Sequence, residues 1–194
     1  RLGSFAGQLT QSAIDTVRIE YEGDVGDMNI RPLTAAALTG LMRPLLQDVN
    51  MVSAPVIARE RGIKVEEVRR EQKGVYESYV RLTVKTERQE RSVAGTVFSD
   101  GKPRIIELKG IHLEADFGKH MLYTANEDKP GFIGSLGTAL GNAGVNIANF
   151  TLGRRDQGGE AVCLVEVDEP VTEDVVRAVS ALPHVMQAQP LSFD

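Results

Sequence analysis

The sequence predicts an α+β protein with two domains, residues 1–118 and 119–194. The first half mixes helical and strand-like segments, and the second half has the order strand, helix, strand, strand, helix, strand. The composition agrees, because 42% hydrophobic and 25% charged residues among 194 are typical of a soluble globular protein with real cores. No apolar run approaches the roughly 20 residues that a membrane helix requires.

The first domain opens with alternating apolar and polar residues over 13–25, which predict a half-buried strand. Apolar residues at helical spacing predict a helix over 31–49, with a kink at Pro44. A second helix is expected over 52–63, ended by Gly62.

Residues 78–118 predict three further strands, with Asp100-Gly101 as the turn of a hairpin. Residues 58–74, "ARERGIKVEEVRREQKG", carry charges of both signs and predict a solvated helix end followed by an exposed strand. Their glutamates cancel the basic stripe that a nucleic-acid site needs. The domain is therefore expected to combine helices with an antiparallel sheet.

The second domain is expected to have the split ferredoxin-like βαββαβ arrangement. The expected strands are 120–127, 145–155, 160–169 and 184–192, and the expected helices are 131–144 and 172–183. The first helix places its apolar residues at a 3–4 spacing: Phe132, Ile133, Leu136 and Leu140. Thr172 is expected to cap the second helix.

Several functional classes find no support in the residues. The net charge of −5 argues against a general nucleic-acid binder. The single cysteine, Cys163, forms no internal disulfide and reads as a buried small hydrophobe, which favours a reduced cytoplasmic location. The three scattered histidines suggest no zinc site. Neither a dinucleotide fingerprint nor a nucleophile elbow occurs, so neither catalytic residues nor a cofactor site is expected.

The stretch "NEDKPGFIGSLGTALGNAGVNI" allows two interpretations. In the first, Pro130 suits the first positions of a helix and Gly131 lets the backbone turn sharply, so the stretch is only a turn. In the second, Asn126 and Asp128 project from one strand end, and the helix start seats a carboxylate while Asp128 holds an ammonium group. Asn146 begins the next strand and adds an amide to this amino-acid clamp.

The segment "LYTANEDKPGFIGSLGTALGNAGVNIANFTLGR" resembles the ACT domain, a regulatory module that binds small molecules. It is particularly similar to the ACT domain that ends bacterial D-3-phosphoglycerate dehydrogenases. The segments "GLMRPLLQDVNMVSAPVIARERGI" and "GTVFSDGKPRIIELKGIHLEADFGKHMLY" resemble the intervening domain of the long form of that family. Since the chain also lacks an initiator methionine, we read it as a regulatory fragment of a longer chain.

This resemblance implies that paired ACT domains bind L-serine, the end product of the pathway, and form a dimer or, in the parent, a tetramer. The effector residues that it implies are Asn126, Asp128, Gly131 and Asn146. The chain departs from the family at Asn126, where known serine-binding members have histidine or tyrosine. The parent is expected to use NAD in catalytic domains that this fragment lacks, so the fragment itself is expected to be catalytically silent.

The intervening domain of the long form is proposed to bind an anion, for which Arg104 matches a basic position. Lys102 and Lys109 are further candidates, with Lys119 beside them. Asp116 stands where the family has another basic residue.

Three other readings remain. In the first the chain is an oligomerisation scaffold without an effector, and in the second it senses a different amino acid. A third reading is an enzyme related to serine dehydratase, which the absence of clustered cysteines disfavours.

Overall fold

The computed structural model describes residues 1–71 and 74–193, and the chain forms two compact units that divide between Lys109 and Gly110. The expected boundary lay later, at 118/119. The difference arises from strand β6, Ile111–Asp116, which packs against β8, Ile147–Arg154. The approach is close, because a Cβ on Gly153 of β8 would lie 2.8 Å from the carbonyl oxygen of His112.

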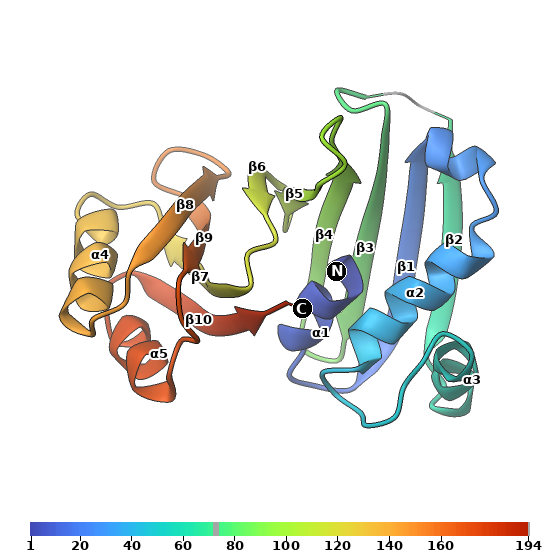
Figure 1. Cartoon of the computed structure of the whole chain (residues 1–194), viewed down its shortest axis with the longest axis horizontal. Helices are drawn as coiled ribbons and strands as arrows, with labels where there is room; N and C mark the ends of the chain where they lie inside the picture. The colour runs from blue at the N-terminus through green and yellow to red at the C-terminus, as the bar shows by residue number, and fades with distance from the viewer. Residues whose placement is uncertain (72–73, 194) are drawn as a thin grey trace. The chain divides into compact units, whose positions relative to one another are not determined.

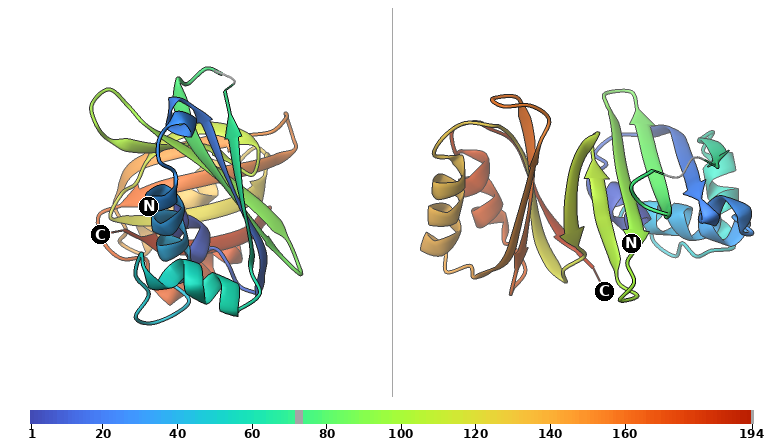
Figure 2. Two further views of the ribbon diagram at one scale, coloured as in Figure 1. Left: turned by 90° about the vertical axis from the view of Figure 1, so that its right-hand side faces the viewer. Right: turned by 90° about the horizontal axis from the view of Figure 1, so that it is seen from above.

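The first unit contains a sheet with the strand order β2-β1-β3-β4-β5, and helices lie over one face of it (Figures 1 and 2). Its elements are α1 (Leu2–Gln8), β1 (Ile14–Gly23), the 3₁₀ helix η1 (Asp24–Asp27), α2 (Arg31–Met42), α3 (Ser53–Glu60), β2 (Lys64–Arg70), β3 (Ser78–Thr86), β4 (Glu90–Val97) and β5 (Pro103–Leu108). Val17, Ile19 and Tyr21 of β1 are fully buried on one face of the sheet. On the other face, Glu20 and Glu22 are also buried, in ion pairs with Arg70 and Arg81, so the second half of the strand is covered on both faces.

The sheet of the first unit is not purely antiparallel. β1 pairs antiparallel with β3, as the sequence predicts, but pairs parallel with β2. A parallel pair needs a long crossover connection, and α2 and α3 supply it. The expected exposed strand within 58–74 is this β2, and Gln72 and Lys73 at the end of that range lie outside the described residues.

Two local predictions for the first unit and its end were wrong, and one helix was missed. The helix expected to continue to residue 49 ends at Met42, so Pro44 follows the helix rather than kinking it. Residues 78–118 form four strands, not three, because Lys109 and Gly110 take positive φ angles of 54° and 74° and turn the chain between β5 and β6. Helix α1 was not predicted, although Phe5 and Leu9 are fully buried at helical spacing.

The second unit has the expected βαββαβ order, preceded by β6. Its elements are β7 (His120–Glu127), α4 (Phe132–Asn142), β8, β9 (Glu160–Val167), α5 (Glu173–Ser180) and β10 (Val185–Ser192). The antiparallel strand pairs give the order β10-β7-β9-β8, and both helices cover one face (Figure 2).

The core between this sheet and its helices confirms most of the predicted apolar face. Phe132, Leu136 and Leu140 of α4 are buried there against β7 and β9, whereas Ile133 is mainly exposed. Thr172 caps α5 as expected, since its Oγ1 accepts a hydrogen bond from the backbone N–H of Val175 at 3.4 Å.

Candidate functional site

The end of β7 places a buried amide beneath the helices of the second unit. Leu122 of β7 belongs to the core that faces α4 and α5, and Asn126 lies on the same face because it is four residues further along the strand. Asn126 is only 1% exposed. Its Nδ2 donates a hydrogen bond to the carbonyl oxygen of Glu127 at 2.9 Å, while its Oδ1 is buried without a partner. An unpartnered buried acceptor of this kind is costly, so this strand end has a hydrogen-bonding position open to a donor.

Asp128 follows β7 and is tied to the β8–β9 connection. Its Oδ2 accepts two hydrogen bonds, from Nη1 of Arg154 at 2.8 Å and from the backbone N–H of Gly158 at 3.1 Å. Its own backbone N–H donates to the carbonyl oxygen of Gly159 at 2.8 Å. The Gly158 N–H first, and the Arg154 guanidinium second, lower the pKa of the Asp128 carboxyl, so this group is negatively charged at neutral pH.

Gly131 forms the junction between this strand end and α4. It caps the helix with a left-handed backbone, φ 89°, and no side chain caps the helix start. Only glycine adopts this conformation without strain. Pro130 therefore lies before the helix, in the turn, and not in its first turn as the sequence suggested. Gly131 also lines an open groove of about 620 Å³ between α4 and α5.

Asn146 lies at the other end of the sheet. It is exposed, and its Nδ2 donates to Oδ2 of Asp168 at 2.6 Å. The next residue, Ile147, pairs with Val167 of β9, which pairs with His120 at the start of β7. Since the strand rises by about 3.3 Å per residue, Asn146 and the end of β7 are roughly 20 Å apart within one chain.

One chain therefore brings Asn126, Asp128 and Gly131 together, and leaves Asn146 out. The structure adds a residue that sequence reasoning missed, Arg154, because it joins Asp128 across 26 positions of sequence. The signal available was strand parity: in this sheet Arg154 pairs with Ala161, which pairs with Asn126, so all three side chains lie on one face.

The basic residues considered for an anion site are divided between the two ends of β5. Arg104 donates to both carboxylate oxygens of Asp100, at 2.7 and 3.3 Å, and its guanidinium carbon lies 4.4 Å from the centre of the Phe98 ring. Lys102 is at the same turn, but Lys109 follows the opposite end of β5, roughly 20 Å away at the spacing of an extended chain. The three residues therefore do not form one cluster, and Arg104 already holds an anion of its own chain.

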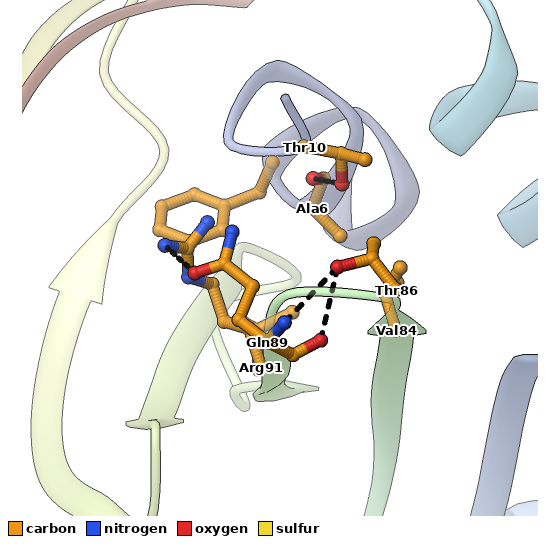
Figure 3. Close-up of a pocket in the computed structure, with 8 residues that line it drawn as sticks. Ala6, Thr10, Val84, Thr86, Gln89 and Arg91 are labelled. Atoms are coloured by element: carbon orange, nitrogen blue, oxygen red, sulfur yellow. Dashed lines mark hydrogen bonds between the residues drawn. The ribbon is translucent and has the colours of Figure 1, made fainter. Parts of the chain in front are cut away.

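A cavity beside Arg91, shown in Figure 3, has a volume of about 10 Å³, which is room for a single water molecule. Two nitrogens of Arg91 donate hydrogen bonds within the fold, Nη1 to the carbonyl oxygen of Leu9 and Nη2 to the side-chain oxygen of Gln89. Within residues 1–71 and 74–193, no three His, Cys, Asp or Glu side chains gather as a metal site would need.

Cys163 is fully buried in β9, as expected for a small hydrophobe. Burial raises the pKa of its thiol to about 12, so the thiol stays protonated and unreactive at neutral pH. In the part of the chain that the structure describes, the helices are too short or too polar to span a bilayer.

Comparison with known proteins agrees with this architecture. The D-3-phosphoglycerate dehydrogenase intervening domain family matches residues 1–109, and the ACT domain family matches residues 120–184. D-3-phosphoglycerate dehydrogenase of Archaeoglobus fulgidus is 33% identical over 191 residues, which cover 97% of this chain and 36% of the relative. The enzyme of Synechocystis sp. is 31% identical over 189 residues, which cover 96% of this chain and 34% of the relative.

The chain thus spans about a third of the length of these relatives. The family match extends over more than half of the chain and confirms the resemblance noted in the sequence. The chain belongs to the D-3-phosphoglycerate dehydrogenase intervening domain family and carries an ACT domain after that domain.

Proposed function

We propose that this chain is a regulatory fragment of a D-3-phosphoglycerate dehydrogenase and that two copies of its ACT domain bind L-serine between them as a feedback effector. The parent enzyme would use NAD in catalytic domains outside this chain and act in the cytoplasm. Effector binding would shift the parent between more and less active states, which requires that L-serine bind one state more tightly than the other.

The observation that supports this proposal is the separation of Asn146 from Asn126 and Asp128. β8 is the last strand in the order β10-β7-β9-β8, so its outer backbone groups are not paired within this sheet and would pair with β8 of a second copy. Two-fold symmetry makes the two β8 strands antiparallel. The start of one β8 then lies beside the end of the other, which brings Asn146 of one chain toward Asp128 of its partner.

This arrangement explains why the proposed clamp residues are split in one chain. It also gives Asn126 a purpose, since a ligand ammonium group or a bridging water can donate to its buried Oδ1. Calorimetric titration with L-serine, with D-serine and glycine as controls, tests the function while light scattering follows the association state. We expect saturable binding of L-serine by a dimer, and loss of binding in both Asp128→Ala and Asn146→Ala.

Mixing the two variants tests the shared site directly. A mixed dimer has one site with both defects and one site that is intact, so mixing is expected to restore L-serine binding that each variant lacks alone. Asn29→Ala, at an exposed asparagine of the first unit, serves as the control and should bind normally. A well-folded dimer that binds no L-serine, D-serine or glycine would leave the alternative of an oligomerisation scaffold, and binding of another amino acid would redefine the effector.

A further inference from the structure

We infer that Arg154 binds the α-carboxylate of the effector while Asp128 binds its ammonium group, so that the ion pair of these two residues recognises a zwitterionic α-amino acid. This inference rests on the proposed function and assigns the carboxylate to a side chain rather than to the start of α4. It is carried by the position of Arg154, by the unused hydrogen-bonding capacity of the pair, and by the neighbouring buried amide.

Arg154 ends β8 on the face of the sheet that α4 and α5 cover. Its cross-strand partner is Ala161, and the partner of Ala161 is Asn126. Ala161 lies between Arg154 and Asn126, and its side chain ends at Cβ, so it does not fill the space between their longer side chains. The guanidinium reaches Asp128, which follows Asn126 by two residues, so the ion pair forms at the strand end that carries the buried amide.

Both members of the ion pair keep groups for a ligand. The guanidinium has five N–H donors in a planar fork, and its hydrogen bond to Asp128 uses Nη1, with the Arg154 side chain 54% exposed. On Asp128, Oδ2 accepts both the Arg154 and the Gly158 hydrogen bonds, which leaves Oδ1 for a cationic donor. A free donor fork beside a free carboxylate oxygen is the electrostatic complement of an amino-acid zwitterion.

The start of α4 is a weaker seat for the carboxylate. It offers backbone dipoles without a charged side chain, whereas a guanidinium supplies a full charge and two parallel donors. The alternative role for Arg154 is a purely structural brace that holds the end of β8 against the β7–α4 connection. The two roles predict different responses to a ligand that lacks the carboxylate.

The test measures the affinity of the 194-residue chain for L-serine and for L-serinamide, which keeps the ammonium group but has no carboxylate. We expect Arg154→Gln to weaken L-serine binding by about ten-fold or more, as for the loss of a charge-assisted hydrogen bond, and to leave the weaker L-serinamide binding unchanged. Arg154→Lys should recover part of the L-serine affinity. Arg177→Gln, which breaks the exposed Asp174–Arg177 pair on α5, is the matched control and should change neither.

The outcomes separate this inference from the function on which it rests. If Arg154→Gln weakens both ligands equally, or neither, Arg154 is a brace or a bystander and the inference is wrong, although L-serine binding stands. If the unaltered chain binds no L-serine, the proposed function fails and takes the inference with it. Thermal unfolding of each variant shows that a lost affinity does not reflect a lost fold.

Discussion

Each unit holds an aspartate–arginine ion pair at a hairpin: one lies within the β4–β5 hairpin, and the other joins the β8–β9 hairpin to the residue that follows β7. In the first, Asp100 and Arg104 are four residues apart, and the arginine uses both carboxylate oxygens. In the second, Asp128 and Arg154 are 26 residues apart, and the arginine uses one oxygen that it shares with the Gly158 N–H. In the Asp100–Arg104 pair, both carboxylate oxygens accept hydrogen bonds from the arginine. In the Asp128–Arg154 pair, one carboxylate oxygen and several guanidinium N–H groups take no part in the ion pair.

The difference follows from how each pair forms. A short hairpin lets the side chains meet face to face, and Phe98 covers the Arg104 guanidinium. The Asp128–Arg154 pair instead joins a strand end to a different connection, so its geometry is set by the whole sheet. Because the sheet, and not the pair itself, sets the geometry of Asp128 and Arg154, the remaining carboxylate oxygen and N–H donors are positioned for a ligand.

The largest expected effect comes from glycines that neighbour the two arginines. A Cβ at Gly95 would lie 2.8 Å from the carbonyl oxygen of Arg104, and one at Gly153 would lie 2.8 Å from that of His112. Gly95→Ala and Gly153→Ala should each lower the free energy of unfolding by about 1–3 kcal/mol, because backbone must shift. Only Gly153→Ala should also weaken L-serine binding.

Denaturant unfolding measures both losses, and Gly137→Ala is the control. Gly137 lies within α4 with nothing within 4 Å of its Cβ direction, so alanine there should raise the free energy of unfolding by about 0.5–1 kcal/mol. A Gly153→Ala protein as stable as the unaltered one would show that β6 and β8 can separate at no cost.

A smaller effect is expected at the two turns. Gly101 and Gly158 both have φ of 77° and open space around them, so an alanine at either adds only the left-handed backbone strain. Each substitution should cost about 1–2 kcal/mol of unfolding free energy. Since the Gly158 N–H holds Asp128, Gly158→Ala should weaken L-serine binding as well, and Gly101→Ala should not. Equal affinities in the two variants would mean that the turn does not position Asp128.

The smallest effect concerns pH. The pKa values of Asp100 and Asp128 are both lowered, mainly by Arg104 in the first case and by the Gly158 N–H in the second. A lowered folded pKa stabilises the protein above the unfolded value, which is about 3.9, and this contribution is lost as the pH falls through the folded pKa. Asp100→Asn and Asp128→Asn should therefore reduce stability at pH 7, and the deficit should disappear in acid.

Urea unfolding at pH 7 and at a pH below both folded pKa values checks this sign. Because Asp100 is exposed and Asp128 is partly exposed, the deficits should be small and should shrink further in high salt. A deficit that persists in acid would have to come from lost packing rather than lost charge.

Part of this picture could be predicted from the sequence. The βαββαβ order followed from periodicity and turn residues, and it also implied that β7 and β8 run in the same direction. Asn146 at the start of β8 and Asn126 at the end of β7 therefore had to lie at opposite ends, a deduction that the residue spacing allowed. The approach of Arg154 to Asp128 was harder, because it depends on which strand lies between them and on which face each side chain takes.

The burial of Asn126 could not be predicted from the sequence for a similar reason. Its neighbours in sequence, Ala125 and Glu127, do not indicate whether the end of β7 is covered, since that depends on where α4 returns over the sheet. Likewise, the parallel pairing of β1 with β2 depends on the path of two helices rather than on the composition of either strand.

The edge strands β2 and β8 differ in charge, with a consequence for how newly made chains behave. β2 carries charged side chains along its length: Lys64, Glu66, Glu67, Arg69 and Arg70. β8 carries one, Arg154, at its last residue. Charges on an edge disfavour pairing with other chains, so β2 is better protected against aggregation than β8. The strand through which two copies are proposed to assemble is thus also the strand through which unassembled chains would aggregate. The yield of soluble protein should therefore depend on how quickly two copies form a dimer.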